Sequence, residues 1–249
     1  MQNYQYSENF FKNQRDMSRS SAQVIIPMLL ELLQPRSVVD VGCGVGGWLA
    51  VFREQGIEDI RGIDGAYVNK DLLFIPKEAF TEYDLRQPFT TDRQYDLVIS
   101  LEVAEHLPPE AAETFVQTLT GLGPVVLFSA AVPYQAGVNH LNEQWQDYWA
   151  GLFRQQGYLP IDTLRRQVWS NENVAFWYAQ NMLLYVREDY LQLHSALLRA
   201  YEQTSPEQLA ILHPKMLTDM GVARWFMFFK RLPFTLQRAL KKRLNRRAG

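Results

Sequence analysis

The chain has 249 residues and is 47% apolar, which is enough to fill the core of one α/β domain with an extension. Its single cysteine, Cys43, excludes an internal disulfide and favours a reducing, cytoplasmic setting. The N-terminus lacks the apolar core of a signal peptide, and no run reaches the ~18 apolar residues that span a bilayer. The net charge of −2 conceals an uneven distribution, because residues 1–223 hold 16 basic and 27 acidic side chains. Since a nucleic-acid backbone binds to basic surfaces, we do not expect nucleic acid as the partner of this acidic part.

The first elements surround a glycine-rich loop. Residues 21–33 carry apolar side chains at helical spacing and end before Pro35, which predicts a helix. Residues 37–50, SVVDVGCGVGGWLA, then predict a buried parallel strand, a tight turn and a second helix. Since the N–H groups at the start of that helix point toward the loop, the stretch predicts a site for a nucleotide-like ligand.

Within this stretch, Asp40 is followed by Gly42, Gly44 and Gly46. This pattern resembles the first motif of the class I S-adenosylmethionine-dependent methyltransferases, and the resemblance extends over residues 24–186. It implies a Rossmann-like α/β fold with a seven-stranded, mostly parallel sheet, an antiparallel last strand, helices on both faces and a helical C-terminal extension. It also implies S-adenosyl-L-methionine as cofactor, with Cys43 as a small loop residue at the cofactor rather than a nucleophile.

Two other classes of function stay open. Gly42, Gly44 and Gly47 also fit the dinucleotide fingerprint G-x-G-x-x-G, which would suit an NAD-dependent oxidoreductase, although Asp40 argues against it. A binding module that keeps the methyltransferase fold without turnover is the other alternative, because a fold does not fix a function.

The next two predicted strands, residues 59–63 and 79–83, each end in an acidic residue. Asp64, followed by Gly65, is placed to accept hydrogen bonds from both ribose hydroxyls. By the resemblance, Asp84 accepts the adenine amino group and the backbone N–H of Leu85 reaches the ring. For both aspartates, the alternative is an ordinary turn residue without a ligand.

Residues 95–100 predict a fourth strand, and the LEVAEHL that follows is similar to the type 11, or UbiG-like, small-molecule methyltransferases. Ser100 and Leu101 would then line the methionine end of the cofactor. Glu102, Glu105 and His106 would share one face if this segment is helical. Three interpretations remain: a general base at His106, a divalent-metal site of these three residues as in some quinone-biosynthesis relatives, or a helix start without a catalytic role. We favour an assignment without a metal.

A second candidate base follows the fifth strand, predicted at residues 124–130 after a helix at 110–119. The loop after it carries aromatic and polar side chains suited to a small-molecule pocket: Tyr134, His140, Asn142 and Trp145. Its H-x-N-x-x-W pattern resembles type 11 relatives, which makes His140 the rival of His106 as general base.

The remaining elements complete the predicted organisation. A helix at 144–156 precedes strands six and seven at 158–165 and 176–186, and a helix follows at 187–201. We divide the chain into an N-terminal segment, 1–20, a cofactor-binding domain, 21–186, and a helical extension, 187–249. In the resembling family, the N-terminal segment often folds over the cofactor as a lid.

The last residues mix large apolar and basic side chains. Residues 225–229 are five consecutive large apolar residues, and residues 224–249 hold nine Lys or Arg and no acidic residue. This composition predicts a helix that lies on an anionic membrane surface, which would place the protein at the inner face of the membrane. The alternative is a helix that packs its aromatic side chains on the domain.

The chemistry implied by the resemblance needs few catalytic groups. A sulfonium methyl is already electrophilic, so the protein must mainly align the acceptor and remove its proton. After the fourth strand the residues are SLEV, not the N-P-P-Y type of amine-methylating enzymes. We therefore expect O-methylation of a small molecule, such as a glycan, a quinone-type compound or another secondary-metabolite hydroxyl.

Overall fold

A computed structural model describes residues 8–135 and 137–216, with side chains from residue 17 onward. The chain divides into one compact unit that ends at His213 and a second unit, 214–249. The strands of the first unit are β1 (Ser37–Val41), β2 (Asp59–Asp64), β3 (Phe80–Glu82), β4 (Leu97–Leu101), β5 (Val125–Ser129), β6 (Tyr158–Ile161) and β7 (Leu183–Arg187). Its α-helices are α1 (Glu8–Leu33), α2 (Gly47–Glu54), α3 (Ala112–Leu122), α4 (Gln146–Gln155), α5 (Arg165–Val168), α6 (Phe176–Asn181), α7 (Glu188–Leu193) and α8 (Ser195–Glu202).

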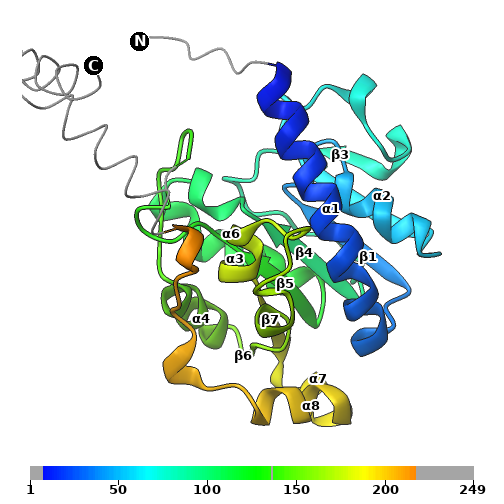
Figure 1. The fold of residues 1–249 in the computed structure, drawn as a ribbon. Coiled ribbons are helices and arrows are strands. Elements are labelled where there is room, and N and C mark those ends of the chain that lie inside the picture. The colour runs from blue at the N-terminus through cyan, green and yellow to red at the C-terminus, as the bar shows by residue number, and fades with distance from the viewer. Residues whose placement is uncertain (1–7, 136, 217–249) are drawn as a thin grey trace, which may run out of the picture. The chain divides into compact units, whose positions relative to one another are not determined.

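The seven strands form one sheet in the order β3-β2-β1-β4-β5-β7-β6 (Figure 1). β1 pairs in parallel with β2 and β4, and the parallel pairing continues to β3 and β5. β7 runs antiparallel to both β5 and β6. The predicted fold class is therefore confirmed, and the chain order reverses between β1 and β4, where open sheets of this kind bind their ligands.

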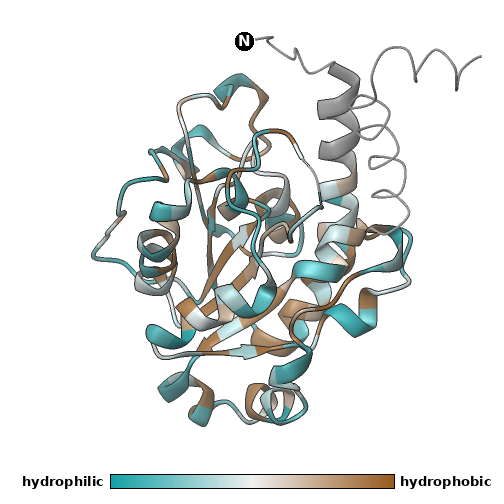
Figure 2. Ribbon diagram, turned by 90° about the vertical axis from the view of Figure 1, so that its left-hand side faces the viewer, coloured by the Kyte–Doolittle hydropathy of each residue, from teal (hydrophilic) through white to brown (hydrophobic). Residues whose placement is uncertain are grey.

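The sheet separates two apolar cores because successive side chains of a strand point to opposite faces. In β1, Val38 belongs to the core under α1 and α2, whereas Val39 and Val41 belong to the core under α3 and α4. The strands are apolar and the outer surfaces of the helices largely hydrophilic (Figure 2). Burial on both faces explains why the strands read as nearly continuous apolar runs.

Helix α1 begins earlier than the sequence predicts, at Glu8 rather than residue 21. It runs beside α2 (Figure 1), and the Ser18 hydroxyl accepts hydrogen bonds from Trp48 Nε1 at 3.0 Å and from the Tyr178 hydroxyl at 3.3 Å. The first bond attaches α1 to α2, which follows the glycine loop, and the second attaches α1 to α6. Residues 1–7 of the expected lid lie outside the described part, and the lid remains a prediction.

The strand predicted at residues 176–186 is wrong in its first half, where the chain forms α6 before β7 begins at Leu183. The helix buries Tyr178 and Ala179 while the polar Gln180 and Asn181 find partners in neighbouring loops. β6 also ends four residues earlier than predicted, because Arg165 turns back to bind Asp162 through two hydrogen bonds of 2.9 and 2.6 Å.

The predicted membrane-surface segment, residues 222–249, lies outside the described residues and stays a prediction. Among the described helices, none combines the length and the apolar character that crossing a bilayer requires.

Candidate cofactor and acceptor site

The glycine loop between β1 and α2 has the backbone conformation that its sequence predicts. Gly42, Gly44 and Gly46 have φ values of 92°, 53° and 82°, a region that side chains with a Cβ rarely adopt. A Cβ on Gly42 would also lie 2.3 Å from Cγ2 of Val103, in the segment that follows β4. Gly42 is therefore required twice, by its own conformation and by the close approach of the LEVAEHL segment.

Asp64, at the end of β2, lies beside this loop. Its carboxylate accepts the N–H of Gly44 at 2.6 Å and the N–H of Gly65 at 2.7 Å. The hydroxyl of Tyr67 donates to the same carboxylate. The structure thus brings the predicted ribose-binding acid and two of the predicted glycines together.

Asp40 is a second buried acid near the loop. Burial raises its pKa well above the ordinary value, and the nearby charge of Asp64 raises it further. Two carboxyl groups near neighbouring strand ends repel each other when both are ionised, and a positively charged ligand would relieve this repulsion. The Cys43 thiol contributes no reactivity, since burial raises its pKa strongly and its Sγ fills the space above Gly62.

Four predicted cofactor residues have surroundings that the sequence did not reveal, and their contacts with the cofactor stay predictions. Ser100 is fully buried and its hydroxyl donates to the carbonyl oxygen of Val41 at 2.8 Å, so its side chain joins β4 to β1. Asp84 is exposed, and Arg86 donates to it at 2.8 and 2.7 Å, which lowers the pKa of the aspartate. Leu85 packs against the core under α3, and Leu101 is partly exposed at the end of β4.

The acidic residues after β4 do not share one helical face. Glu102 lies outside any helix with φ 56°, and a short 3-10 helix, η3 (Ala104–His106), follows it. A positive φ at a non-glycine residue is costly and tends to occur at functional sites. Burial raises the pKa of Glu102. Its carboxylate accepts hydrogen bonds from Nδ2 of Asn181 at 3.1 Å and from Nε2 of Gln135 at 2.9 Å.

Gln180 and Asn181 are site residues that sequence reasoning left unexplained. Because β7 runs antiparallel to β5, the residues just before β7 reach the same sheet edge as those just after β4 and β5. Both carboxamides are buried, and Nε2 of Gln180 donates to Oε1 of Gln135 at 3.2 Å. The only sequence signal was two polar residues inside an otherwise apolar predicted strand.

The two rival histidines lie next to each other. The ring centroids of His106 and His140 are 4.9 Å apart with planes at 81°. His140 Nδ1 lies 2.8 Å from Oε1 of Glu143, and a carboxylate partner there requires the proton on Nδ1 and leaves Nε2 as acceptor in the neutral ring. Among the described residues, the hydrogen-bond partner of His106 is the carbonyl oxygen of Asn139, 3.4 Å from Nδ1. Burial and, to a lesser degree, the charge of His140 lower the pKa of His106.

Glu105 completes this cluster. It is 1% exposed, and its Oε2 has no hydrogen-bond partner within the described part of the chain. One ligand atom each from Glu105, His106 and His140 lie within 4.8 Å of one another. A buried carboxylate oxygen without a hydrogen-bond partner, beside two imidazoles, fits a divalent cation. Glu102, the third residue of the metal set considered from the sequence, instead accepts hydrogen bonds from Asn181 and Gln135.

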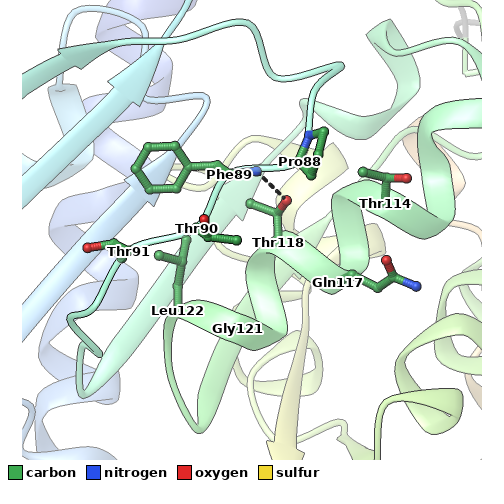
Figure 3. Close-up of a pocket in the computed structure, with 9 residues that line it drawn as sticks. All are labelled: Pro88, Phe89, Thr90, Thr91, Thr114, Gln117, Thr118, Gly121 and Leu122. Atoms are coloured by element: carbon green, nitrogen blue, oxygen red, sulfur yellow. Dashed lines mark hydrogen bonds between the residues drawn. The ribbon is translucent and has the colours of Figure 1, made fainter.

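A separate hollow of about 240 Å³ lies between the segment before β4 and α3 (Figure 3). Its walls include Phe89, whose N–H donates to Oγ1 of Thr118 at 3.2 Å. None of the predicted cofactor or acceptor residues lines it. It is not part of the candidate site.

Comparison with known proteins identifies the family and the fold. A family model described as a methyltransferase domain matches residues 13–172. A search of curated protein sequences found no match.

Similar solved structures include three proteins of low sequence identity. Magnesium protoporphyrin IX methyltransferase (ChlM) from Synechocystis PCC 6803 with bound SAH is 18% identical with a TM-score of 0.52, covering 74% of this chain and 91% of its own. DesVI from Streptomyces venezuelae is 15% identical with a TM-score of 0.52 and coverages of 74% and 100%. The methyltransferase domain of bacterial CtHen1-C is 16% identical with a TM-score of 0.50 and coverages of 68% and 97%.

At these identities the structural likeness shows the shared fold, and the finer placement in the type 11 group stays a prediction. The family model, in contrast, covers more than half of the chain. The chain therefore belongs to the methyltransferase-domain family, a class I group whose methyl donor is S-adenosylmethionine.

Proposed function

We propose that this protein transfers the methyl group of S-adenosylmethionine to a hydroxyl oxygen of a small molecule. The observation that carries the proposal is the arrangement at one sheet edge. Asp64 and the glycine loop lie at the ends of β1 and β2, and the His106–His140 pair follows β4 and β5. A cofactor site and an acid–base site thus adjoin at the point where the strand order reverses.

The cofactor side of the site binds and orients S-adenosylmethionine. The Asp64 carboxylate accepts ribose hydroxyls, and the glycine loop allows the ligand to approach the backbone between β1 and α2. Asp40 and Asp64 together favour a cationic ligand. S-adenosylmethionine supplies an electrophilic methyl group on a positively charged sulfur. A contact from Asp84 to adenine requires Arg86 to release the carboxylate.

On the acceptor side, His140 is the better candidate for the general base. Glu143 holds its Nδ1 at 2.8 Å, so Nε2 is left to take the acceptor proton. Oε2 of Glu143 also accepts the backbone N–H of Tyr134 at 2.8 Å, which fixes the carboxylate that orients the ring. Within the described ranges, no carboxylate is hydrogen-bonded to the ring of His106 in this way.

A divalent cation is the competing role for the same side chains. Glu105, His106 and His140 would hold it, and the cation would lower the pKa of an acceptor hydroxyl as a Lewis acid. The two roles of His140 exclude each other, since an imidazole nitrogen bound to a cation cannot accept a proton. The orphaned Oε2 of Glu105 favours the cation, and the Glu143 contact favours the base.

Two measurements test the proposal. Calorimetry should show saturable binding of S-adenosylhomocysteine and none of NAD; the reverse result would replace methyl transfer by redox chemistry. A screen with tritium-labelled methyl donor over sugars, quinols and phenols should then find an acceptor. Loss of transfer in His140→Ala with little loss after chelator treatment supports the base, and loss after chelator treatment supports the cation. Transfer that survives both His106→Ala and His140→Ala would contradict both roles.

A further inference from the structure

The side chain of Tyr67 lies on the carboxylate that the cofactor needs. A turn closed by the N–H of Val68 and the carbonyl oxygen of Gly65, 3.1 Å apart, folds Tyr67 back toward the end of β2. The hydroxyl of Tyr67 donates to Oδ1 of Asp64. The residue is nevertheless 82% exposed, so this contact buries little of its surface.

The contact depends on the glycine between the two residues. A Cβ on Gly65 would lie 2.4 Å from Cε1 of Tyr67, so the ring can occupy this place only above a residue without a side chain. Although most of the ring is exposed, loss of solvent around the hydroxyl and the charge of Asp64 raise the pKa of Tyr67, which favours the phenol as the donor in this bond. The sequence DGAY thus provides an acceptor, a gap and a donor within one turn.

The hydrogen-bonding capacity of Asp64 limits what else can bind there. An ionised carboxylate has about four acceptor positions. Two are taken by the backbone N–H groups of Gly44 and Gly65, which the loop and strand hold in place, and a third by Tyr67. A ribose presents two hydroxyls, and one position remains. Asp64 is 2% exposed in this arrangement, so the diol also lacks a path to the carboxylate.

We infer that Tyr67 competes with the ribose of the cofactor for Asp64, and that its hydroxyl must leave the carboxylate when the cofactor or its product binds. The inference rests on the proposed function, in which Asp64 binds ribose. In the empty site, the Tyr67 hydroxyl donates a hydrogen bond to the buried carboxylate of Asp64. Without it, this acceptor position would lack a partner. The need to displace it weakens the binding of donor and product alike and speeds the release of the product.

The test compares Tyr67→Phe, which keeps the ring and removes the donor, with Tyr148→Phe on α4 as the matched control. Calorimetry of S-adenosylhomocysteine should show about tenfold tighter binding to Tyr67→Phe than to the wild type, as expected for removal of one bond to a charged group. The control should bind like the wild type. In stopped-flow measurements the tighter binding should appear mainly as slower dissociation.

A second pair of probes isolates the ribose. Tyr67→Phe should bind adenosine more tightly than the wild type does, but should bind 2′,3′-dideoxyadenosine unchanged, because that probe needs no position on Asp64. Equal or weaker binding of S-adenosylhomocysteine to Tyr67→Phe, or an equal gain for both nucleosides, would overturn the inference while leaving the proposed function intact. A wild-type protein that does not bind S-adenosylhomocysteine at all would refute both.

Discussion

His106 and His140 meet edge to face with ring centroids 4.9 Å apart, although one follows β4 and the other lies in the loop after β5. The two loops are joined by backbone bonds, since the carbonyl oxygen of Glu105 accepts the N–H groups of Leu141 at 2.7 Å and Asn142 at 3.0 Å. The two rival bases of the sequence are therefore parts of one cluster, and a change at either residue affects the other.

The cation role predicts that this cluster binds a divalent cation through Glu105. Glu105→Gln keeps the shape of the side chain but removes the charge, so the affinity for Mn²⁺ should fall at least tenfold. Isothermal titration of the full chain with Mn²⁺ measures this. His194→Ala is the control, because His194 stacks on Tyr190 outside the site. Equal Mn²⁺ affinity in Glu105→Gln and the wild type would assign the cluster to acid–base chemistry alone.

Asn181→Asp should destabilise the fold in a pH-dependent way. The amide of Asn181 donates to Glu102 and to Oε1 of Gln135 at 2.9 Å, and an aspartate would place a second buried carboxyl beside Glu102. We expect a loss of about 3–5 kcal/mol in the free energy of unfolding at pH 8. Two adjacent buried carboxyls have raised pKa values, so the folded state binds more protons than the unfolded state and part of the loss is recovered at pH 5.

Urea unfolding at the two pH values measures this difference. The exposed Asn173→Asp serves as the control and should change stability by less than about 0.5 kcal/mol. A loss in Asn181→Asp that is the same at pH 5 and pH 8 would mean that the new carboxyl does not interact with Glu102.

The parts of the molecule that local sequence determines were predicted well. The β-branched run before Gly42 predicted β1, and the glycine spacing predicted a loop whose φ values are positive. The acid at the end of β2 was placed beside that loop because parallel strands end at a common edge. These features depend on residue type and spacing within one βαβ unit, and so they are visible without the structure.

The contacts between distant loops were not predictable in the same way. Glu143 lies three residues after His140, and its role was missed because a loop has no fixed periodicity from which to place side chains. Asn181 reaches Glu102 only because β7 inserts antiparallel between β5 and β6. The apolar and aromatic residues of 176–179 suit a strand by propensity, but tertiary packing made them helical. Ser100 was predicted to line the cofactor, and its 2.8 Å bond to Val41 of β1 depends on strand pairing that a single residue does not reveal.

Asp40→Asn should stabilise the empty protein and weaken cofactor binding. Because burial raises the pKa of Asp40 in the folded state, the folded protein keeps a proton that the unfolded chain loses above about pH 4. The free energy of unfolding of the wild type therefore falls as the pH rises from the pKa of Asp40 in the unfolded chain to its raised pKa in the folded protein. The fall is about 1.4 kcal/mol for each pH unit in this range. Asparagine does not titrate, so the variant should lose this slope.

Urea unfolding between pH 4 and 8 measures the slope, and the exposed Asp92→Asn should retain it. In calorimetry, Asp40→Asn should bind S-adenosylmethionine about tenfold more weakly, since a bound sulfonium favours the ionised form of Asp40 and asparagine cannot ionise. An unchanged slope would show that Asp40 does not carry the extra proton, and unchanged affinity would separate it from the cofactor site.

Gly42→Ala should be the most damaging single methyl addition in the glycine loop. Its φ of 92° disfavours any side chain, and the new Cβ would meet Val103 at 2.3 Å. We expect a loss of about 2–4 kcal/mol, of which about 1 kcal/mol comes from the backbone conformation and the rest from the overlap. Gly151→Ala is the matched control, because its Cβ would contact nothing within 4 Å inside α4 and should stabilise the helix by up to about 1 kcal/mol.

The double variant, Gly42→Ala with Val103→Ala, separates the cost of the backbone conformation from the cost of the overlap. Removing the Val103 methyl groups relieves the overlap but not the backbone conformation, so the double variant should lose less than the sum of the single losses. Thermal unfolding of the four proteins in this cycle gives the coupling between the residues. Additive losses would mean that the loop moves away from the LEVAEHL segment at little cost, and the tight contact between the cofactor loop and the segment carrying Glu105 and His106 would then have no energetic weight.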